Sequence, residues 1–550
     1  MAIMTLTKHE VKETIGNLSD EEIDYKLNMA ELGVERITEN EIEIEITPNR
    51  PDLLSKPGLI RYLEAYFRKP GLKNYKINKP EKNYKVIIDK SVKQVRPFTR
   101  CAIVRGMNFN DEKIKEIIDI QEKLHGGYGR NRKKLAIGIY PLETIKLPIK
   151  YLGLPPEEIK FQPLEFPKEI NGRQILSQHP TGREYGNLLK DSEVFPVFQD
   201  ANKEILSMPP IINSNKTGKI TEKTKEIFIE CSGFNPQYLQ KTLNMIMTAL
   251  ADMGGKIYAM EIHDKKKTIS PDLEPEEFPF SIENINKLLG LNLPEKEIKK
   301  LLAKMGIGFK KSKKTLALVP AYRTDIIHEV DLAEEIAIAY GYDKFVPEIP
   351  DISTIGEENP MVVLKRKITE ILTGLQLIEI SSYHLSTKEK QFKKIGFKEY
   401  LDKVIEIEDS KTENNILRTY LLANSIQVLS ENSDAQYPQK IFELGRVFYS
   451  DEEAETGIGE DENLCISLCH EKADFTEIKQ ILDYLMRMLN KEYEIIETEH
   501  PAFIKGRCGE IILKNIQKPI GILGEIHPNY LKNNKIKMPI SSLEINISDL

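Results

Sequence analysis

The segment from Arg323 to Glu335, RTDIIHEVDLAEE, carries five carboxylates within thirteen residues. At about 100° of rotation per residue, a helix places Asp331, Glu334 and Glu335 on one side, with Asp325 near the helix start. Hard cations such as Mg²⁺ prefer carboxylate oxygens as ligands. The types and spacing of Asp325, Asp331, Glu334 and Glu335 therefore predict a magnesium site.

A second interpretation of this acidic segment needs no metal. Ile327 and Ile338 lie on the same side as the acids, whereas Val330 belongs to the expected core face. The acidic side is therefore expected to be covered by protein. Covered acids repel one another and need a compensating positive charge, which Arg323 and Lys344 would supply as an ion-pair cluster. The spacing leaves the metal and the ion-pair cluster both open.

Other motifs in the chain point less clearly to chemistry. The P-loop and the zinc motif HExxH are absent from the sequence. Cys465 and Cys469 form a CxxxC spacing beside His470, but the residues between them read as a strand, which favours a structural role. His125 lies beside glycines and arginines, and a single histidine with no fixed partner is more often structural. No nucleophilic triad is indicated.

Composition describes a globular chain of several domains. With 550 residues, 40% hydrophobic and 30% charged, it has material for about three or four domains. No apolar run approaches the ~20 residues that span a membrane, and the N-terminus lacks the apolar region of a signal peptide. Five cysteines, an odd number, argue against a disulfide framework and predict a cytoplasmic protein.

Charge gives only a weak indication of nucleic-acid binding. The net charge is −7, but the chain contains two local basic clusters, Arg130–Lys134 and Lys310–Lys314. Such clusters can neutralise phosphates, and at loop tips they also serve simply to keep the surface solvated. Neither cluster by itself predicts contact with RNA.

The pattern of apolar residues divides the chain into four segments, at residues 1–79, 80–270, 271–345 and 346–550. The first contains an alternating strand, Glu41–Ile46, followed by the turn Pro-Asn-Arg-Pro and a helix with Leu59, Tyr62, Leu63 and Tyr66 on one face. The second mixes short strands and helices with many Pro and Gly turns.

The third and fourth segments are separated by a proline-rich link, VPEIPDISTIGEENP. In the third, FPFS predicts a strand, Ser281 an N-cap, and Gly290 the end of the first helix. Pro294 is expected in the first turn of the next helix, which Gly306 ends, and a hairpin then leads to the acidic helix. The fourth mixes amphipathic helices with strands such as Lys440–Leu444.

Three long stretches carry a resemblance to a known family. ITPNRPDLLSKPGLIRYLEAY (46–66), MPPIINSNKTGKITEKTKEIFIECSG (208–233) and VPAYRTDIIHEVDLAEEIAIAYGYDKF (319–345) resemble the β subunit of phenylalanyl-tRNA synthetase, in its archaeal and eukaryotic form. ILRTYLLANSIQVLSEN (416–432) and KIFELGRVF (440–448) extend the likeness over nearly the whole chain.

The resemblance implies a multidomain α+β fold built on antiparallel sheets. Residues 1–79 would form an N-terminal α+β domain, 80–270 a tRNA-editing domain of the B3/B4 type, 271–345 a small B5-like domain resembling nucleic-acid binders, and 346–550 a class II catalytic-like domain at the subunit interface. In the family, the motif matching Asp325, Asp331, Glu334 and Glu335 is a magnesium site, which favours the metal interpretation.

The resemblance also implies the partners. The β subunit would join an α subunit in an α2β2 heterotetramer that binds tRNA(Phe), with ATP and phenylalanine bound through α. Class II enzymes need a glycine-rich stretch leading to an ATP-binding arginine. After Arg446 the remaining arginines, Arg487 and Arg507, follow no Gly-x-Gly pattern. The last domain is therefore expected to be catalytically silent.

An editing site is expected because phenylalanine and tyrosine differ by one hydroxyl. A hydrophobic pocket rejects an added hydroxyl only about 10²-fold, so a second site that recognises tyrosine is useful. By position, the resemblance implies Phe198, Ser207 and Glu230 as pocket residues. Leucine is usual at 198 and aspartate at 230, so this chain departs from the family twice. The alternatives are a free-standing tRNA-editing hydrolase and an RNA-binding scaffold without active editing.

Overall fold

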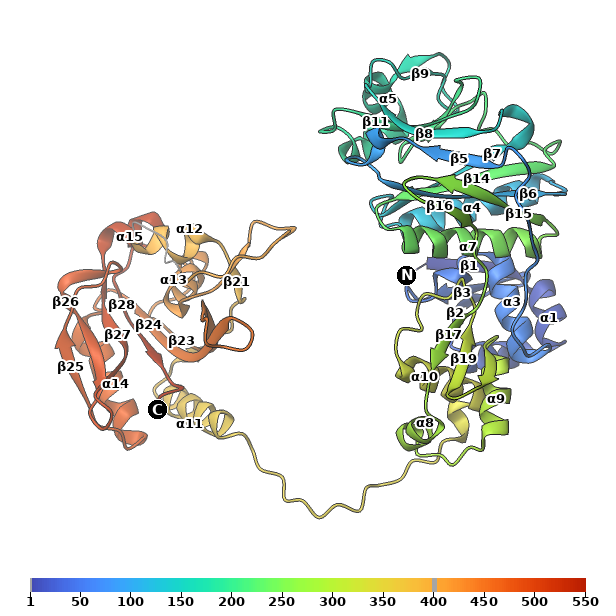
Figure 1. Cartoon of the computed structure of the whole chain (residues 1–550). Coiled ribbons are helices and arrows are strands. Elements are labelled where there is room, and N and C mark those ends of the chain that lie inside the picture. The colour runs from blue at the N-terminus through green and yellow to red at the C-terminus, as the bar shows by residue number, and fades with distance from the viewer. Residues whose placement is uncertain (1, 398–402) are drawn as a thin grey trace. The chain divides into compact units, whose positions relative to one another are not determined.

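The computed structural model describes residues 2–397 and 403–550, which divide into two compact units (Figure 1). The first unit extends to Ile349 and the second begins at Pro350. Residues 346–359, within the predicted proline-rich link, form no helix or strand. Both units combine helices with largely antiparallel sheets, as the expected α+β class requires.

The chain begins with a three-stranded antiparallel sheet in the order β1-β3-β2. The predicted strand is confirmed as β3 (Glu41–Ile46), whose isoleucines are buried while the glutamates between them are not. The predicted helix is confirmed as α3 (Lys56–Phe67), with its four expected apolar residues buried. The other elements are β1 (Ala2–Thr7), α1 (Lys8–Ile15), α2 (Asp20–Met29) and β2 (Gly33–Ile37).

An eleven-stranded sheet follows, and its main path runs β13-β12-β11-β8-β5-β15-β6-β14-β7, with β4 and β16 also paired to β15. Pairing is antiparallel except where β5 lies beside β8 and β15, and β4 beside β15. Its strands are β4 (Ile77–Asn78), β5 (Lys85–Ile88), β6 (Phe98–Arg105), β7 (Leu135–Pro141), β8 (Ile149–Leu154), β11 (Phe195–Gln199), β12 (Ile205–Met208), β13 (Ile212–Asn213), β14 (Glu226–Gly233), β15 (Lys256–His263) and β16 (Lys267–Ser270).

This sheet curls strongly. The Tyr140 side chain on β7 contacts the Ser207 side chain on β12, although these strands lie near opposite ends of the strand order. A hydrophobic cluster that includes Val86, Tyr151 and Phe228 joins side chains from strands along the whole curl. Helices α4 (Asp111–Gly126) and α7 (Pro236–Asp252) pack on the sheet. Smaller elements complete this region: β9 (Lys160–Phe161), β10 (Ile170–Asn171), α5 (Gly172–Gln178) and α6 (Pro180–Tyr185).

The region after residue 275 follows the expected order of elements. Ser281 caps α8 (Ile282–Leu289) by accepting a hydrogen bond from the Asn284 N–H, and Gly290 ends this helix in the left-handed conformation. Pro294 is the N-cap of the next helix rather than part of its first turn, which corrects that prediction. The elements are β17 (Glu276–Pro279), α8, α9 (Glu295–Lys304), β18 (Gly308–Lys311), β19 (Thr315–Val319) and α10 (Glu329–Tyr340).

The three predicted segments of the first unit share one hydrophobic core. Leu59, Leu243 and Ile336, from three different segments, belong to the same buried cluster. Polar contacts reinforce this core, since the Tyr66 hydroxyl donates to the Ile338 carbonyl at 3.0 Å and Arg61 pairs with Asp252 at 2.6 Å. Residues 2–349 therefore fold together as one compact body.

The second unit is a seven-stranded sheet covered by helices on both faces. Its strand order is β20-β23-β24-β28-β27-β26-β25, and every pair except β20–β23 is antiparallel. The strands are β20 (Ile378–Glu379), β23 (Gln439–Ser450), β24 (Ile458–Cys469), β25 (Tyr493–Glu497), β26 (Phe503–Leu513), β27 (Lys518–Ile526) and β28 (Ile540–Asn546).

Alternation along β24 assigns its side chains to two cores. Leu464 and Ile466 pack with α11 (Pro360–Gly374) and α14 (Phe475–Met488), whereas Cys465 packs with α13 (Leu421–Glu431). The cysteines of the CxxxC motif are buried free thiols within this strand. The remaining elements are β21 (Leu385–Ser386), α12 (Lys388–Gln391), β22 (Ile416–Leu417) and α15 (Pro528–Asn533). In the described part of the chain, no helix combines the length and apolarity that crossing a bilayer requires.

Candidate functional sites

A cavity of about 520 Å³ opens beside the curled sheet and is lined by both Ser207 and Glu230. Ser207 comes from β12 and Glu230 from β14, so the curl brings together residues that the strand order keeps apart. Apolar side chains of α4, including Ile114 and Ile117, line another wall. The cavity thus combines apolar walls with many polar and charged side chains, among them Glu122, Arg132 and Lys219.

Tyr140 connects the two polar residues of this cavity. Its hydroxyl donates to Ser207 Oγ at 2.7 Å and lies 3.3 Å from Glu230 Oε1 and 3.4 Å from Asn213 Oδ1. The tyrosine is fully buried, and its ring stacks on Phe228. Sequence reasoning missed Tyr140 because it lies in a run of buried residues, LAIGIYP, that reads as an ordinary core strand.

Glu230 is a buried carboxyl group with one oxygen free. Only 1% of the residue is exposed, and its Oε2 has no hydrogen-bond partner in the described part of the chain. Burial raises the pKa of Glu230 to about 8, against the lowering effects of the Arg96 charge and of the Tyr140 and Ser232 hydroxyls. At neutral pH this side chain is therefore largely protonated, and it can donate as well as accept a hydrogen bond.

Gly138 makes room for this arrangement. It lies opposite Glu230 in the β7–β14 pairing. A Cβ atom at position 138 would lie only 2.6 Å from Glu230 Oε1 and would also clash with the Tyr140 hydroxyl. Any larger residue at this position would displace the carboxyl group, so the glycine is required by close approach.

His125 and Arg132 line the same cavity and have structural partners. His125 Nε2 accepts a hydrogen bond from the Ile137 N–H at 2.8 Å, and burial lowers the pKa of the imidazole. Arg132 is buried and donates to the carbonyls of Pro210 and Ile211 at 3.2 and 2.9 Å. Arg132 thus supports the cavity wall and is not part of an exposed phosphate-binding surface.

Phe198 does not line the cavity. It is fully buried in the core of the curl and stacks on Tyr151, with ring centroids 4.4 Å apart. It pairs with Ser207 in the β11–β12 register, but its ring fills the interior of the sheet. Of the three predicted pocket residues, the structure brings Ser207 and Glu230 together and places Phe198 behind them.

The acidic segment is organised around Arg323. The guanidinium group, only 2% exposed, donates through Nε to Asp325 at 2.8 Å and through Nη1 and Nη2 to Glu335 at 3.1 and 2.6 Å. Despite burial, the hydrogen bonds and charge of Arg323 lower the pKa of Asp325 to about 2. Two of the four predicted metal ligands therefore share one guanidinium group of the protein itself.

The other two acids make no hydrogen bond or ion pair with Arg323. Asp331 accepts hydrogen bonds from the N–H groups of Ile327 and His328 at 2.7 and 2.6 Å, which caps the start of α10. Glu334 is exposed, and slight burial together with the neighbouring acids raises its pKa. Among the described residues, no group of three or more acidic, His or Cys side chains converges to hold a metal ion.

The predicted faces of this helix need correction. Ile327, expected to cover the acids, lies before α10 begins at Glu329 and is 79% exposed. Val330, expected in the core, is 47% exposed. The ion-pair interpretation fits Arg323, whereas Lys344 lies over the Tyr340 ring instead of reaching the acids. In this arrangement Asp325 and Glu335 are engaged by Arg323, so a magnesium ion held directly by all four acids would require Arg323 to release them.

Comparison with known proteins assigns a family to the whole chain. Residues 82–249 match the B3/4 domain, 278–342 the tRNA synthetase B5 domain, and 346–547 the CLM domain of the phenylalanyl-tRNA synthetase β chain. The chain is 37% identical to the phenylalanine–tRNA ligase β subunit of Thermococcus sibiricus, over 98% of this chain and 97% of the relative. It is 34% identical to the β subunit of Methanosarcina barkeri, over 100% and 99%.

A solved structure agrees with these relatives. The crystal structure of an N-terminal fragment of the phenylalanyl-tRNA synthetase β subunit from Pyrococcus horikoshii is 36% identical, with a TM-score of 0.58. It covers 62% of this chain and 99% of the fragment. Sequence and fold thus agree that the chain belongs to the family of phenylalanine–tRNA ligase β subunits.

Proposed function

We propose that the chain is the β subunit of a phenylalanine–tRNA ligase, and that the cavity beside Ser207 and Glu230 hydrolyses Tyr-tRNA(Phe). It would act with an α subunit, in an α2β2 assembly, which holds ATP and phenylalanine and attaches phenylalanine to tRNA(Phe). The length of the match supports this function, because the chain spans 97–99% of two relatives named as β subunits. The five free, buried cysteines support a reducing cytoplasm.

The observation that carries the editing proposal is the position of Glu230. A site discriminates strongly between a substrate with a hydroxyl and one without it only if the site provides a buried hydrogen-bond partner for that hydroxyl. Glu230 is one of the residues that line the cavity, and its buried Oε2 has no hydrogen-bond partner among the described residues. A tyrosine hydroxyl would supply the missing partner, whereas phenylalanine would leave this oxygen unsatisfied.

Ser207 is assigned in this proposal to the ester rather than to the aromatic ring. Its oxygen accepts a hydrogen bond from the Tyr140 hydroxyl, so its own proton is free to be donated to an ester oxygen or an attacking water. In the hydrolysis, the water oxygen bonds to the ester carbonyl carbon and the bond to the terminal ribose oxygen breaks. The ribose oxygen takes a proton, which gives tyrosine and free tRNA.

The decisive experiment measures deacylation of Tyr-tRNA(Phe) and Phe-tRNA(Phe) by the αβ enzyme. Ser207→Ala should slow Tyr-tRNA hydrolysis, and Glu230→Gln should reduce the preference for tyrosine over phenylalanine. Ser177→Ala and Glu193→Gln change exposed residues of the same region and should match the parent. Parental rates and preference in both pocket variants would reject this cavity as the editing site.

Two other functions were left open by the sequence. A free-standing editing hydrolase has little use for the CLM-type domain, which matches residues 346–547 here. An RNA-binding scaffold would bind tRNA without deacylating it, so the same experiment separates it from the proposal. Magnesium remains a prediction for Asp325, Asp331, Glu334 and Glu335, and no step of the proposed reaction depends on it.

A further inference from the structure

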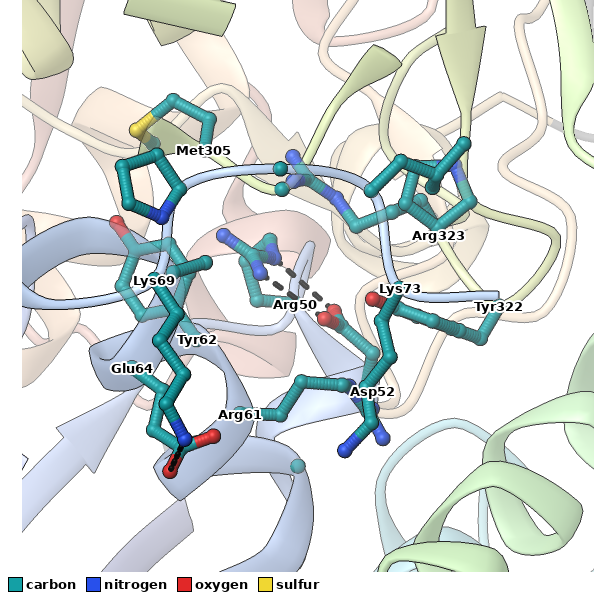
Figure 2. Close-up of a pocket in the computed structure, with 17 residues that line it drawn as sticks. Arg50, Asp52, Arg61, Tyr62, Glu64, Lys69, Lys73, Met305, Tyr322 and Arg323 are labelled. Atoms are coloured by element: carbon teal, nitrogen blue, oxygen red, sulfur yellow. Dashed lines mark hydrogen bonds and ion pairs between the residues drawn. The ribbon is translucent and has the colours of Figure 1, made fainter. Parts of the chain in front are cut away.

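A second cavity, of about 340 Å³, lies in the first unit between α3 and residues 320–323 (Figure 2). Residues 69–73, which follow α3, line it as well. It shares no lining residue with the cavity beside Ser207 and Glu230. The two cavities are therefore distinct sites.

Three nearly buried guanidinium groups line this cavity. Arg50, Arg61 and Arg323 are at most 7% exposed, and arginine stays charged at any physiological pH. Two of them are held by aromatic rings, since Arg50 lies 4.8 Å from the ring centroid of Tyr62 and Arg61 lies 4.2 Å from that of Tyr322. The guanidinium groups are thus fixed in position before any ligand arrives.

The carboxylates that balance these arginines lie mostly outside the cavity lining. Asp252 pairs with Arg61, and Asp325 and Glu335 pair with Arg323, but none of these three acids lines the cavity. The charged lining consists of five cations and two acids: Arg50, Arg61, Lys69, Lys73 and Arg323 against Asp52 and Glu64. Lys69 also pairs with Glu64, and Lys73 with Asp252. The five cations are thus matched by five carboxylates, and what the cavity offers an anion is the unused N–H donors of its arginines rather than a net positive charge.

Several N–H donors remain free to face this space. Arg50 bonds Asp52 through Nε and Nη2, at 3.0 and 2.9 Å, which leaves Nη1 without an acceptor among the described residues (Figure 2). Arg61 uses only Nη1, toward Tyr75 and Asp252. The free nitrogens are not among the polar atoms sealed from solvent, so they face open space although their residues are nearly buried.

We propose that this cavity binds a phosphate monoester or inorganic phosphate. The planar guanidinium group can donate two parallel hydrogen bonds to the oxygens of a phosphate, and fixed arginines bind it in a defined orientation. A cavity of 340 Å³ holds a phosphate group with its first waters. In a protein that handles tRNA, the group comes either from solution or from the 5′ end of the RNA.

The first test uses the full-length chain and inorganic phosphate. Isothermal titration should show phosphate binding, with sodium chloride of equal ionic strength as the reference. Arg50→Gln combined with Asp52→Asn removes one cation and its partner together, and it should weaken binding at least about tenfold. Arg61→Lys keeps the positive charge beside Asp252 but loses the planar set of guanidinium donors. This variant should therefore also bind phosphate more weakly than the parent.

A matched control removes an exposed ion pair elsewhere in the unit. Arg173→Gln with Glu157→Gln should leave phosphate affinity unchanged, because this pair lies on the surface. Absence of binding to the parent at millimolar phosphate, or equal binding by parent and both cavity variants, would overturn the proposal. Circular dichroism confirms that each variant is folded, and Ser207→Ala should bind phosphate normally whether or not editing is confirmed.

A second arm identifies the source of the phosphate. Transcripts of tRNA(Phe) with a 5′-phosphate and with a 5′-hydroxyl are compared for affinity. If the parent binds the 5′-phosphate transcript more tightly and the Arg50 and Asp52 double variant does not, the phosphate in this cavity is the 5′-phosphate of the RNA. Equal affinity, with phosphate binding still lost in the double variant, assigns it to phosphate from solution.

Discussion

The Tyr140 hydroxyl donates a hydrogen bond to Ser207 Oγ across 2.7 Å, and this bond joins β7 to β12 across the opening of a curled sheet. The same hydroxyl lies 3.3 Å from Glu230 Oε1. Ser207 and Glu230 therefore depend on one buried tyrosine for their relative position, and the pocket forms only when the sheet closes on itself.

Tyr140→Phe should slow Tyr-tRNA(Phe) hydrolysis by the αβ enzyme and leave phenylalanine charging unchanged. Removal of the hydroxyl leaves Ser207 without its hydrogen-bond donor and Glu230 with one partner fewer, which costs about 1–3 kcal/mol of stability. Deacylation kinetics and thermal unfolding measure the two effects. A parental deacylation rate combined with the lowered stability would reduce Tyr140 to a purely structural role.

The stability of the first unit should depend on pH through Glu230. Burial raises the pKa of Glu230 to about 8, so the folded state holds a proton that the unfolded state loses near its ordinary pKa of 4.5. The contribution of this proton to the free energy of unfolding is complete below about pH 4.5. It is lost as the pH rises to about 8, at up to about 1.4 kcal/mol per pH unit. Glu230→Gln cannot titrate, so the unfolding midpoint of the parent should fall relative to this variant between pH 5 and 8. Parallel midpoints across this range would contradict a buried, protonated Glu230.

Phe198→Leu should lower stability without altering the discrimination between tyrosine and phenylalanine. The ring stacks on Tyr151 inside the curl and does not line the cavity, so the substitution removes core packing worth about 1–2 kcal/mol. Thermal unfolding together with deacylation of both aminoacyl-tRNAs provides the measurement. If Phe198→Leu changed the ratio of the two rates as much as Glu230→Gln does, Phe198 would contribute to the recognition of tyrosine.

Arg323→Gln should destabilise the first unit strongly, by about 3–5 kcal/mol, because Asp325 and Glu335 would remain buried without a counter-charge. Added Mg²⁺ should raise the unfolding temperature of this variant more than that of the parent, since the two freed carboxylates suit a hard cation. Equal magnesium effects on parent and variant would show that Arg323 and the metal do not share these acids.

Activation of phenylalanine should require the α subunit. Arg487 and Arg507 in the second unit are exposed, Arg507 pairs with Glu525, and neither follows the glycine-rich stretch expected before an ATP-binding arginine. The chain alone should therefore show no ATP–pyrophosphate exchange with phenylalanine, and exchange should appear when α is added. Exchange by the purified chain alone would contradict a catalytically silent second unit.

The sequence by itself determined the local elements. Alternation at period two predicted β3, and a serine followed by apolar helical spacing predicted α8 from its cap to Gly290. These features depend on residues close together in the chain, so they are visible without the fold. The long matching stretches likewise indicated the family and the region that carries Ser207 and Glu230.

Only the tertiary structure decided which side chains meet. Tyr140 is indistinguishable from a core residue until the sheet curls, and Phe198 cannot be separated from the pocket until its ring is seen against Tyr151. Arg323 was one of two cations that could balance the acidic helix, and folding selected it by burying it between Asp325 and Glu335. In each case the contact joins residues whose distance depends on the closure of a sheet or the packing of a loop, which local patterns do not encode.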